Sequence, residues 1–156
     1  MSAPSPYRIV DEPSPGALVR AVVSPLWPLF ALLFAGAWVA LPWFVLNAFA
    51  LGSATRARET FLAAAGLAGS LALAALVLGL DARGAMPAGA SDYVRMLVVA
   101  WHLLVGFGLY VLQARGFRVY TQLGGPARSG FWIVLLTTVV KARVLAGSPL
   151  WTLSLS

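Results

Sequence analysis

The sequence predicts an all-α integral membrane protein, built as a bundle of four transmembrane helices. The first observation is composition: 60% of the residues are hydrophobic and 10% are charged, whereas soluble domains have about 45–50% and about 25%. The second is a mean hydropathy of +0.86. The third is that long charge-free runs alternate with short segments rich in glycine, proline and arginine. This composition excludes an ordinary water-soluble domain, and it also excludes a disordered chain.

The runs divide the chain into three parts. Residues 1–23 are a proline-rich N-terminal tail with a short interfacial stretch, residues 24–147 are the four-span transmembrane domain, and residues 148–156 are a short interfacial C-terminal tail. The first 16 residues contain four prolines and two adjacent acids, which leaves too little apolar surface to offset the entropy of folding. They also lack the basic start and apolar stretch of a secretory signal, so we expect this tail on the mature protein.

The first span is expected at residues 24–50, within a run of 29 uncharged residues that ends at Gly52. A continuous helix of that length would reach about 43 Å, well beyond a hydrocarbon core of about 30 Å. Pro42 removes one backbone hydrogen bond and disfavours helical geometry at the residue before it. We therefore expect one spanning helix that is kinked near Pro42. A span followed by a short re-entrant piece is the alternative.

The other three spans are expected at residues 59–80, 92–114 and 130–147. The last one has an uncharged stretch of only ten residues, 131–140, which is short for a membrane crossing. It can cross if Lys141 and Arg143 extend their charged ends to the far headgroup region. Three spans plus an interfacial segment is the alternative.

Small residues follow two rows of the second span at helical spacing. One row is Gly66, Ser70 and Ala74, and the other is Ala64, Ala68 and Ala72. Between apolar helices in lipid, small residues allow the backbones to approach and to gain dispersion contacts. We expect this helix to pack against neighbours on two faces, one in its own bundle and one on a foreign helix.

Two short sequence matches recur at an offset of 72 residues. Residues 36–39 and 108–111 share Gly-x-aromatic-Val, and residues 51–56 and 123–128 share Leu-Gly-x-x-x-Arg. The shift carries one expected helical hairpin onto the next, which is the pattern of two parallel repeats found in some transporters. Chance matching in a chain rich in leucine and alanine is the alternative.

Three polar side chains fall inside the expected spans: Asn47, His102 and Gln113. Asn47 is expected to cross-link helices, with a polar lining of a pore or headgroup pocket as the alternative. A histidine in lipid needs a hydrogen-bond partner. The alternatives for His102 are haem ligation in a symmetric dimer, with room for the porphyrin edge beside Gly106, and contact with Ser70 as in a rhomboid-like intramembrane protease.

The sequence offers few groups for catalysis. None of the five acids falls inside an expected hydrocarbon core, where ion-coupled carriers usually place them. The chain has no cysteine, which excludes disulfides, thiolate metal sites and iron–sulfur clusters. Ser70 lacks the Gly-x-Ser-x-Gly setting of a nucleophile, and the loops lack a phosphate-binding Gly-x-x-x-x-Gly-Lys. We therefore predict no catalytic residue, no cofactor, no metal and no enzyme activity.

The eleven basic residues give a formal net charge of +6. They are scattered at the ends of apolar runs, which is typical of contact with lipid headgroups or partner acids rather than with nucleic acid. The candidates for such contacts are Arg56, Arg58, Arg115, Arg118, Arg128, Lys141 and Arg143. In a four-span topology one side carries six of the basic residues and the other carries five, so their distribution sets no orientation.

These exclusions predict a small non-catalytic, multi-pass protein that serves as an accessory or structural subunit of a larger membrane complex. The expected partners are the lipid bilayer and either protein partners within the membrane or further copies of the chain. The abundance of arginine and alanine favours a bacterial cytoplasmic (inner) membrane. A small homo-oligomeric transporter or channel is the alternative.

Overall fold

The computed structural model describes residues 18–85 and 89–147, and this part of the chain is all-helical. It contains five α-helices and a short 3-10 turn at Val19–Ala21, with one isolated β-bridge and no strand. The predicted all-α class is therefore confirmed. Residues 1–17 of the N-terminal tail predicted at residues 1–23, and the whole C-terminal tail predicted at residues 148–156, lie outside the described residues.

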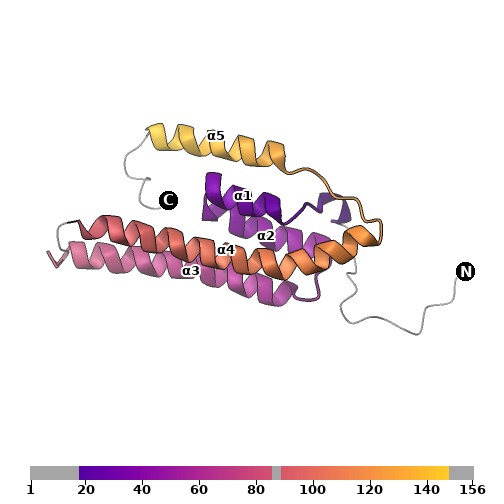
Figure 1. Ribbon diagram of the computed structural model, residues 1–156. Helices are drawn as coiled ribbons and strands as arrows, with labels where there is room; N and C mark the ends of the chain where they lie inside the picture. The colour runs from indigo at the N-terminus through magenta and orange to yellow at the C-terminus, as the bar shows by residue number, and fades with distance from the viewer. Residues whose placement is uncertain (1–17, 86–88, 148–156) are drawn as a thin grey trace, which may run out of the picture.

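The first apolar run folds back on itself as a helical hairpin (Figure 1). Helix α1, Leu26–Phe34, is followed after two residues by α2, Ala37–Leu51. The two ends of the hairpin meet, because the amide of Val23 donates to Asn47 Oδ1 over 3.0 Å. The prediction of one helix over residues 24–50 is wrong. The excess length of the run is taken up by a reversal of the chain.

Gly36 makes this reversal possible. Its φ of 98° and ψ of 172° lie in a region that is essentially restricted to glycine. The amides of Ala35 and Gly36 both donate to the Ala31 carbonyl, over 2.7 and 2.9 Å, and so close the end of α1. Pro42 lies inside α2, which continues to Leu51. The helix is therefore not interrupted at Pro42, and the chain reverses at the glycine.

Helices α3, Arg56–Asp81, and α4, Ala90–Gln122, form a long antiparallel pair (Figure 1). Helix α3 agrees with the expected span over residues 59–80. Helix α4 continues eight residues beyond the predicted end at residue 114, so that end is wrong. Gly116 lies inside the helix and faces α2, since a Cβ there would lie 3.4 Å from Leu51 Cδ2.

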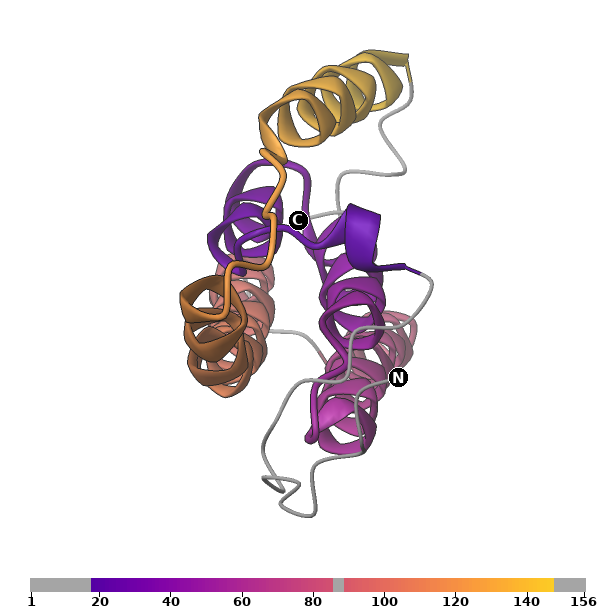
Figure 2. The same ribbon diagram turned by 90° about the vertical axis from the view of Figure 1, so that its right-hand side faces the viewer.

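Helix α5, Phe131–Gly147, agrees with the fourth expected segment and packs against α1. The amide of Arg128 donates to the Val22 carbonyl over 2.9 Å, which ties the start of α5 to the start of α1. Seen along the helices, α5 lies outside the α1–α2 hairpin, on the side away from α3 and α4 (Figure 2). The order of layers is therefore α5, then the hairpin, then the long pair.

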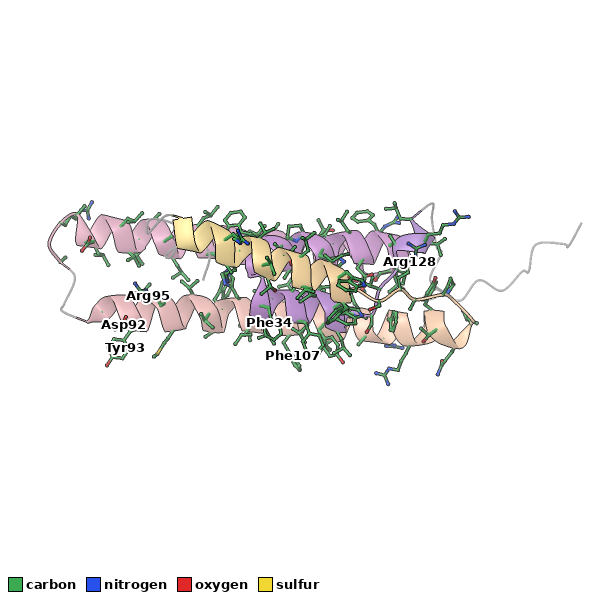
Figure 3. All side chains as sticks on the ribbon, turned by 90° about the horizontal axis from the view of Figure 1, so that it is seen from above. Phe34, Asp92, Tyr93, Arg95, Phe107 and Arg128 are labelled. Carbon is green, nitrogen blue, oxygen red and sulfur yellow. The ribbon has the colours of Figure 1, made fainter. Side chains whose placement is uncertain are left out.

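The hairpin covers only part of the length of the long pair. Phe34, at the end of α1, and Phe107 of α4 lie in the middle of the molecule, between Arg95 and Arg128 (Figure 3). The main core lies at this contact, and its buried residues include Leu41 and Phe44 of α2 together with Leu109 of α4. The tip of the hairpin thus ends near the midpoint of the two long helices.

Two helices are long and apolar enough to cross a membrane, namely α3 and the Asp92–Gln122 part of α4. Four such helices were expected, so within the described ranges a four-span bundle is not confirmed. The two parallel repeats are also wrong: the 72-residue shift places the α1–α2 hairpin, turning at Gly36, onto α4, in which Gly108 is part of one continuous helix.

We predict that replacing Gly36 with alanine destabilises the hairpin. A side chain at this φ and ψ costs about 1–3 kcal/mol, so thermal unfolding of the detergent-solubilised protein should begin at lower temperature. The matched control is Gly79→Ala in α3, where an added Cβ has no neighbour within 4 Å. An equal effect of the two substitutions would contradict the role of Gly36.

Candidate functional site

A buried chain of hydrogen bonds lies at the base of the hairpin, where α2, α3 and α4 meet. Asn47 of α2, Glu59 of α3 and Gln113 of α4 are at most 2% exposed. Asn47 Nδ2 donates to Gln113 Oε1 over 3.0 Å, and Gln113 Nε2 donates to Glu59 Oε2 over 2.7 Å. The second proton of Gln113 Nε2 goes to the Phe44 carbonyl at 2.6 Å. We call Asn47, Glu59 and Gln113, with their hydrogen bonds, the base network.

The other oxygen of Glu59 is held by the turn between α2 and α3. The hydroxyl groups of Ser53 and Thr55 donate to Glu59 Oε1 over 2.5 and 2.7 Å. All three side chains that donate to the carboxyl group are neutral, and the acid is fully buried. Burying an acid is costly unless hydrogen bonds replace its water, and here three hydrogen bonds do so.

No role was predicted for Glu59, which is the first residue of the span expected at residues 59–80. A signal was present: Ser53 and Thr55 immediately precede a helix with an acid in its first turn, a pattern that often marks local side-chain pairing at a helix start. The hydrogen bond to Gln113, which is 54 residues away, has no such local signal. The structure brings together the two amides that were expected inside the spans, Asn47 and Gln113.

The base network joins three helices, and all of its buried polar atoms have hydrogen-bond partners. Within residues 18–85 and 89–147, every buried side-chain nitrogen and oxygen has a hydrogen-bond partner, whereas a ligand site keeps groups that await the ligand. The same ranges hold no group of three or more His, Asp or Glu side chains placed to bind a metal ion. The network therefore fixes the depth and rotation of α2 against α3 and α4.

A second polar contact joins α3 to α4 nearer the middle of the long pair. Ser70 Oγ lies 2.5 Å from His102 Nε2 and donates to the Gly66 carbonyl over 2.8 Å. Trp101 Nε1 donates to the same carbonyl over 3.0 Å. Ser70 and His102 are thus in contact, as the protease alternative requires.

The Ser70 hydroxyl has two neighbours in this contact, the Gly66 carbonyl and His102 Nε2. A hydroxyl has one proton, and the tautomer of His102 determines whether Nε2 accepts that proton or donates its own. A serine nucleophile needs the histidine as its base. The room expected for a haem beside Gly106 is filled, because a Cβ there would overlap Leu32 of the hairpin. The contact is a hydrogen bond between two packed helices.

The two small-residue rows of α3 face in different directions. Gly66 is buried and Ser70 and Ala74 are half-buried, so this row packs inside the molecule. A Cβ on Gly66 would lie 2.8 Å from Val105 of α4 and 3.1 Å from Leu41 of α2. The second row, Ala64, Ala68 and Ala72, is exposed. One row therefore brings three helices together and the other faces outward.

The basic side chains lie on the outside of the molecule. Arg56 extends over the ring of Phe49, 5.9 Å from its centre. Lys141 is half-buried on α5. The remaining candidates are all exposed: Arg56, Arg58, Arg115, Arg118, Arg128 and Arg143.

The chain matches no protein-family model, no curated protein and no solved structure.

We predict that Gln113→Leu lowers the free energy of unfolding by more than about 2 kcal/mol, because it leaves buried groups of Asn47 and Glu59 without partners. The control on the same helix is Thr121→Val, which removes an exposed hydroxyl bonded only to nearby carbonyls of α4 and should change stability by no more than about 0.5 kcal/mol. Denaturant titration in mild detergent measures both. Equal stabilities would contradict the base network.

The inward and outward rows give a matched pair of substitutions. Gly66→Leu should cost about 1–3 kcal/mol, because the new side chain overlaps Leu41 and Val105. Ala68→Leu, half a helical turn away on the exposed row, should leave the unfolding temperature of the isolated chain unchanged. A stability loss at Ala68 as large as at Gly66 would mean that the exposed row packs within the chain.

Proposed function

We propose that this chain is an integral membrane protein in which α3 and α4 cross the bilayer and the α1–α2 hairpin enters from one side and turns near mid-depth. Large apolar side chains that face outward support this placement, among them Phe61 at 75%, Leu104 at 68% and Trp132 at 73% exposure. Water would penalise such a surface. The composition supports a bacterial cytoplasmic membrane.

The apolar lengths of the two long helices fit a bilayer. The stretch of α4 between Arg95 and Arg115 rises about 30 Å, which equals the thickness of the hydrocarbon core. The hairpin is shorter, since its nine-residue α1 rises only about 14 Å. Its irregular turn at Gly36 is compatible with membrane depth because the hairpin packs against protein.

Within this membrane placement, we propose that the protein is a non-catalytic subunit that binds a partner helix through α5. The observation that carries the proposal is the position of Lys141 and Arg143. Helix α5 starts beside α1, where the rings of Phe131 and Trp27 are 6.3 Å apart. Lys141 and Arg143 lie about 15 Å and about 18 Å further along, roughly halfway across the core.

Cations at that depth need an anion. In the described ranges, no acidic side chain lies within ion-pair distance of Lys141 or Arg143. Ionisable groups inside a membrane usually pair with one another. The outward face of α5 runs from Trp132 through Leu136 and Val140 to Arg143, and all four side chains are exposed. This face fits an apolar transmembrane helix with a central acidic residue.

The exposed row on α3 supports the same role, because Ala64, Ala68 and Ala72 offer a second surface suited to close helix packing. A non-catalytic role is supported by the setting of Ser70, which lacks a Gly-x-Ser-x-Gly motif and bonds to the Gly66 carbonyl of its own helix.

The test uses a synthetic apolar transmembrane helix with a central glutamate, and the same helix with glutamine. We predict that the glutamate helix associates with the protein in vesicles, measured by energy transfer, and that Lys141→Met with Arg143→Met weakens the association about tenfold or more. The control is Arg83→Met, in the loop between α3 and α4. Equal binding of both helices would contradict the partner site.

The transporter or channel reading predicts another outcome. Native mass spectrometry would then give a single series at multiples of 16.4 kDa, and vesicles containing the protein would release an encapsulated solute. A homo-oligomer that conducts a solute, and ignores the glutamate helix, would replace the proposed subunit role.

A further inference from the structure

Most of the described arginines lie at one end of the molecule, the end where the α1–α2 hairpin begins and finishes. Because the chain turns back at Gly36, Arg20 before the hairpin and Arg56 after it lie at the same end. Helix α4 returns to this end, and the β-bridge between Val23 and Arg128 holds the following loop there. This end carries six arginines, all exposed: Arg20, Arg56, Arg58, Arg115, Arg118 and Arg128. We call it the arginine end.

The two ends differ strongly in charge. Among the described residues, the only acid at the arginine end is Glu59, whose carboxyl group is fully buried in the base network. The opposite end carries Arg83 and Arg95 together with Asp81 and Asp92, and Arg95 lies 3.7 Å from Asp92. One end is therefore strongly cationic and the other is balanced.

The hairpin increases this asymmetry. In a four-span topology, Arg20 would lie on the side of Arg83 and Arg95, and the same eight arginines would be divided five against three. With the first run folded back, the described loops and helix ends carry six arginines at one end and two at the other. Basic residues near membrane-spanning segments are retained on the cytoplasmic side.

We infer that the arginine end faces the cytoplasm and binds the phosphate groups of anionic phospholipids in the inner leaflet. This inference rests on the proposed membrane placement, and not on the partner helix. Arg58 and Arg115 flank the apolar stretches of α3 and α4, at headgroup level. A guanidinium group binds phosphate through two parallel hydrogen bonds, and the cytoplasmic leaflet supplies the negative charge. The hairpin and α5 then enter the membrane from the cytoplasm, and the loop between α3 and α4 lies outside.

The orientation is tested by labelling single cysteines with a membrane-impermeant maleimide in spheroplasts, because the natural chain has no cysteine. Ala85→Cys, at the end opposite the arginines, should be labelled in intact spheroplasts. Ala57→Cys, between two exposed arginines, should be labelled only after permeabilisation. Both positions are exposed. Labelling of Ala57→Cys alone in intact spheroplasts would overturn the orientation.

Failure of the membrane placement gives a different result. If the protein does not span a membrane, carbonate washing releases it and the two cysteines behave alike in every preparation. A protein that stays in the membrane with the reverse labelling pattern contradicts only the orientation.

Lipid binding is tested on the purified protein by counting retained phosphatidylglycerol in native mass spectra, with phosphatidylcholine as the comparison. A variant with four arginines changed to glutamine should retain about tenfold less phosphatidylglycerol, or less still. The four are Arg56, Arg58, Arg118 and Arg128. The control variant, Arg83→Gln with Arg95→Gln, should retain it. Equal retention of the two lipids would overturn the proposed lipid-binding surface. Displacement of phosphatidylglycerol by millimolar glycerol phosphate would also overturn it, and would indicate a site for free phosphate instead.

Discussion

The base network of Asn47, Gln113 and Glu59 is the interaction on which the rest of the structure depends. Apolar packing alone positions a short hairpin poorly in lipid, because lipid chains are as apolar as its side chains. Directional hydrogen bonds supply the missing constraint. Asn47 bonds to Val23 on one side and to Gln113 on the other, so the same amide closes the hairpin and attaches it to α4. The start of α5 is in turn placed by the neighbouring segment, through the bridge between Val23 and Arg128.

The reversal at Gly36 determines what each end of the molecule carries. A hairpin returns the chain to the side from which it entered, so every later element changes side relative to a topology with one more crossing. The cationic residues then separate into two groups with different surroundings. In the proposed membrane placement, the arginines at the base of the hairpin lie at headgroup level, and Lys141 and Arg143 of α5 lie at the depth of the hydrocarbon core. We propose different anions for these two groups, lipid phosphate for the first and a carboxylate for the second.

Composition and charge-free runs were enough to predict the all-α class and the extents of α3 and α5. The first run was misread because hydropathy does not distinguish one long helix from two short ones. Its reach of about 43 Å against a core of about 30 Å was the available warning, but only a kink near Pro42 was predicted and no reversal at Gly36. The burial of Glu59 could not be foreseen, since Gln113 comes from a distant helix. The contact between Ser70 and His102 depends on how two helices are rotated, which spacing along one helix does not define.

The distance in sequence between Asn47 and Gln113 has a consequence for biosynthesis. The two residues are 66 positions apart, and at about 5–20 residues per second a ribosome needs about 3–13 seconds to add the second after the first. During that interval the hairpin exists without the amide that anchors it, and nine-residue α1 is too short to stay in the bilayer as a crossing of its own. In the proposed membrane placement, the hairpin is made before α3 and α4 but takes its final place only after α4 has been inserted beside α3.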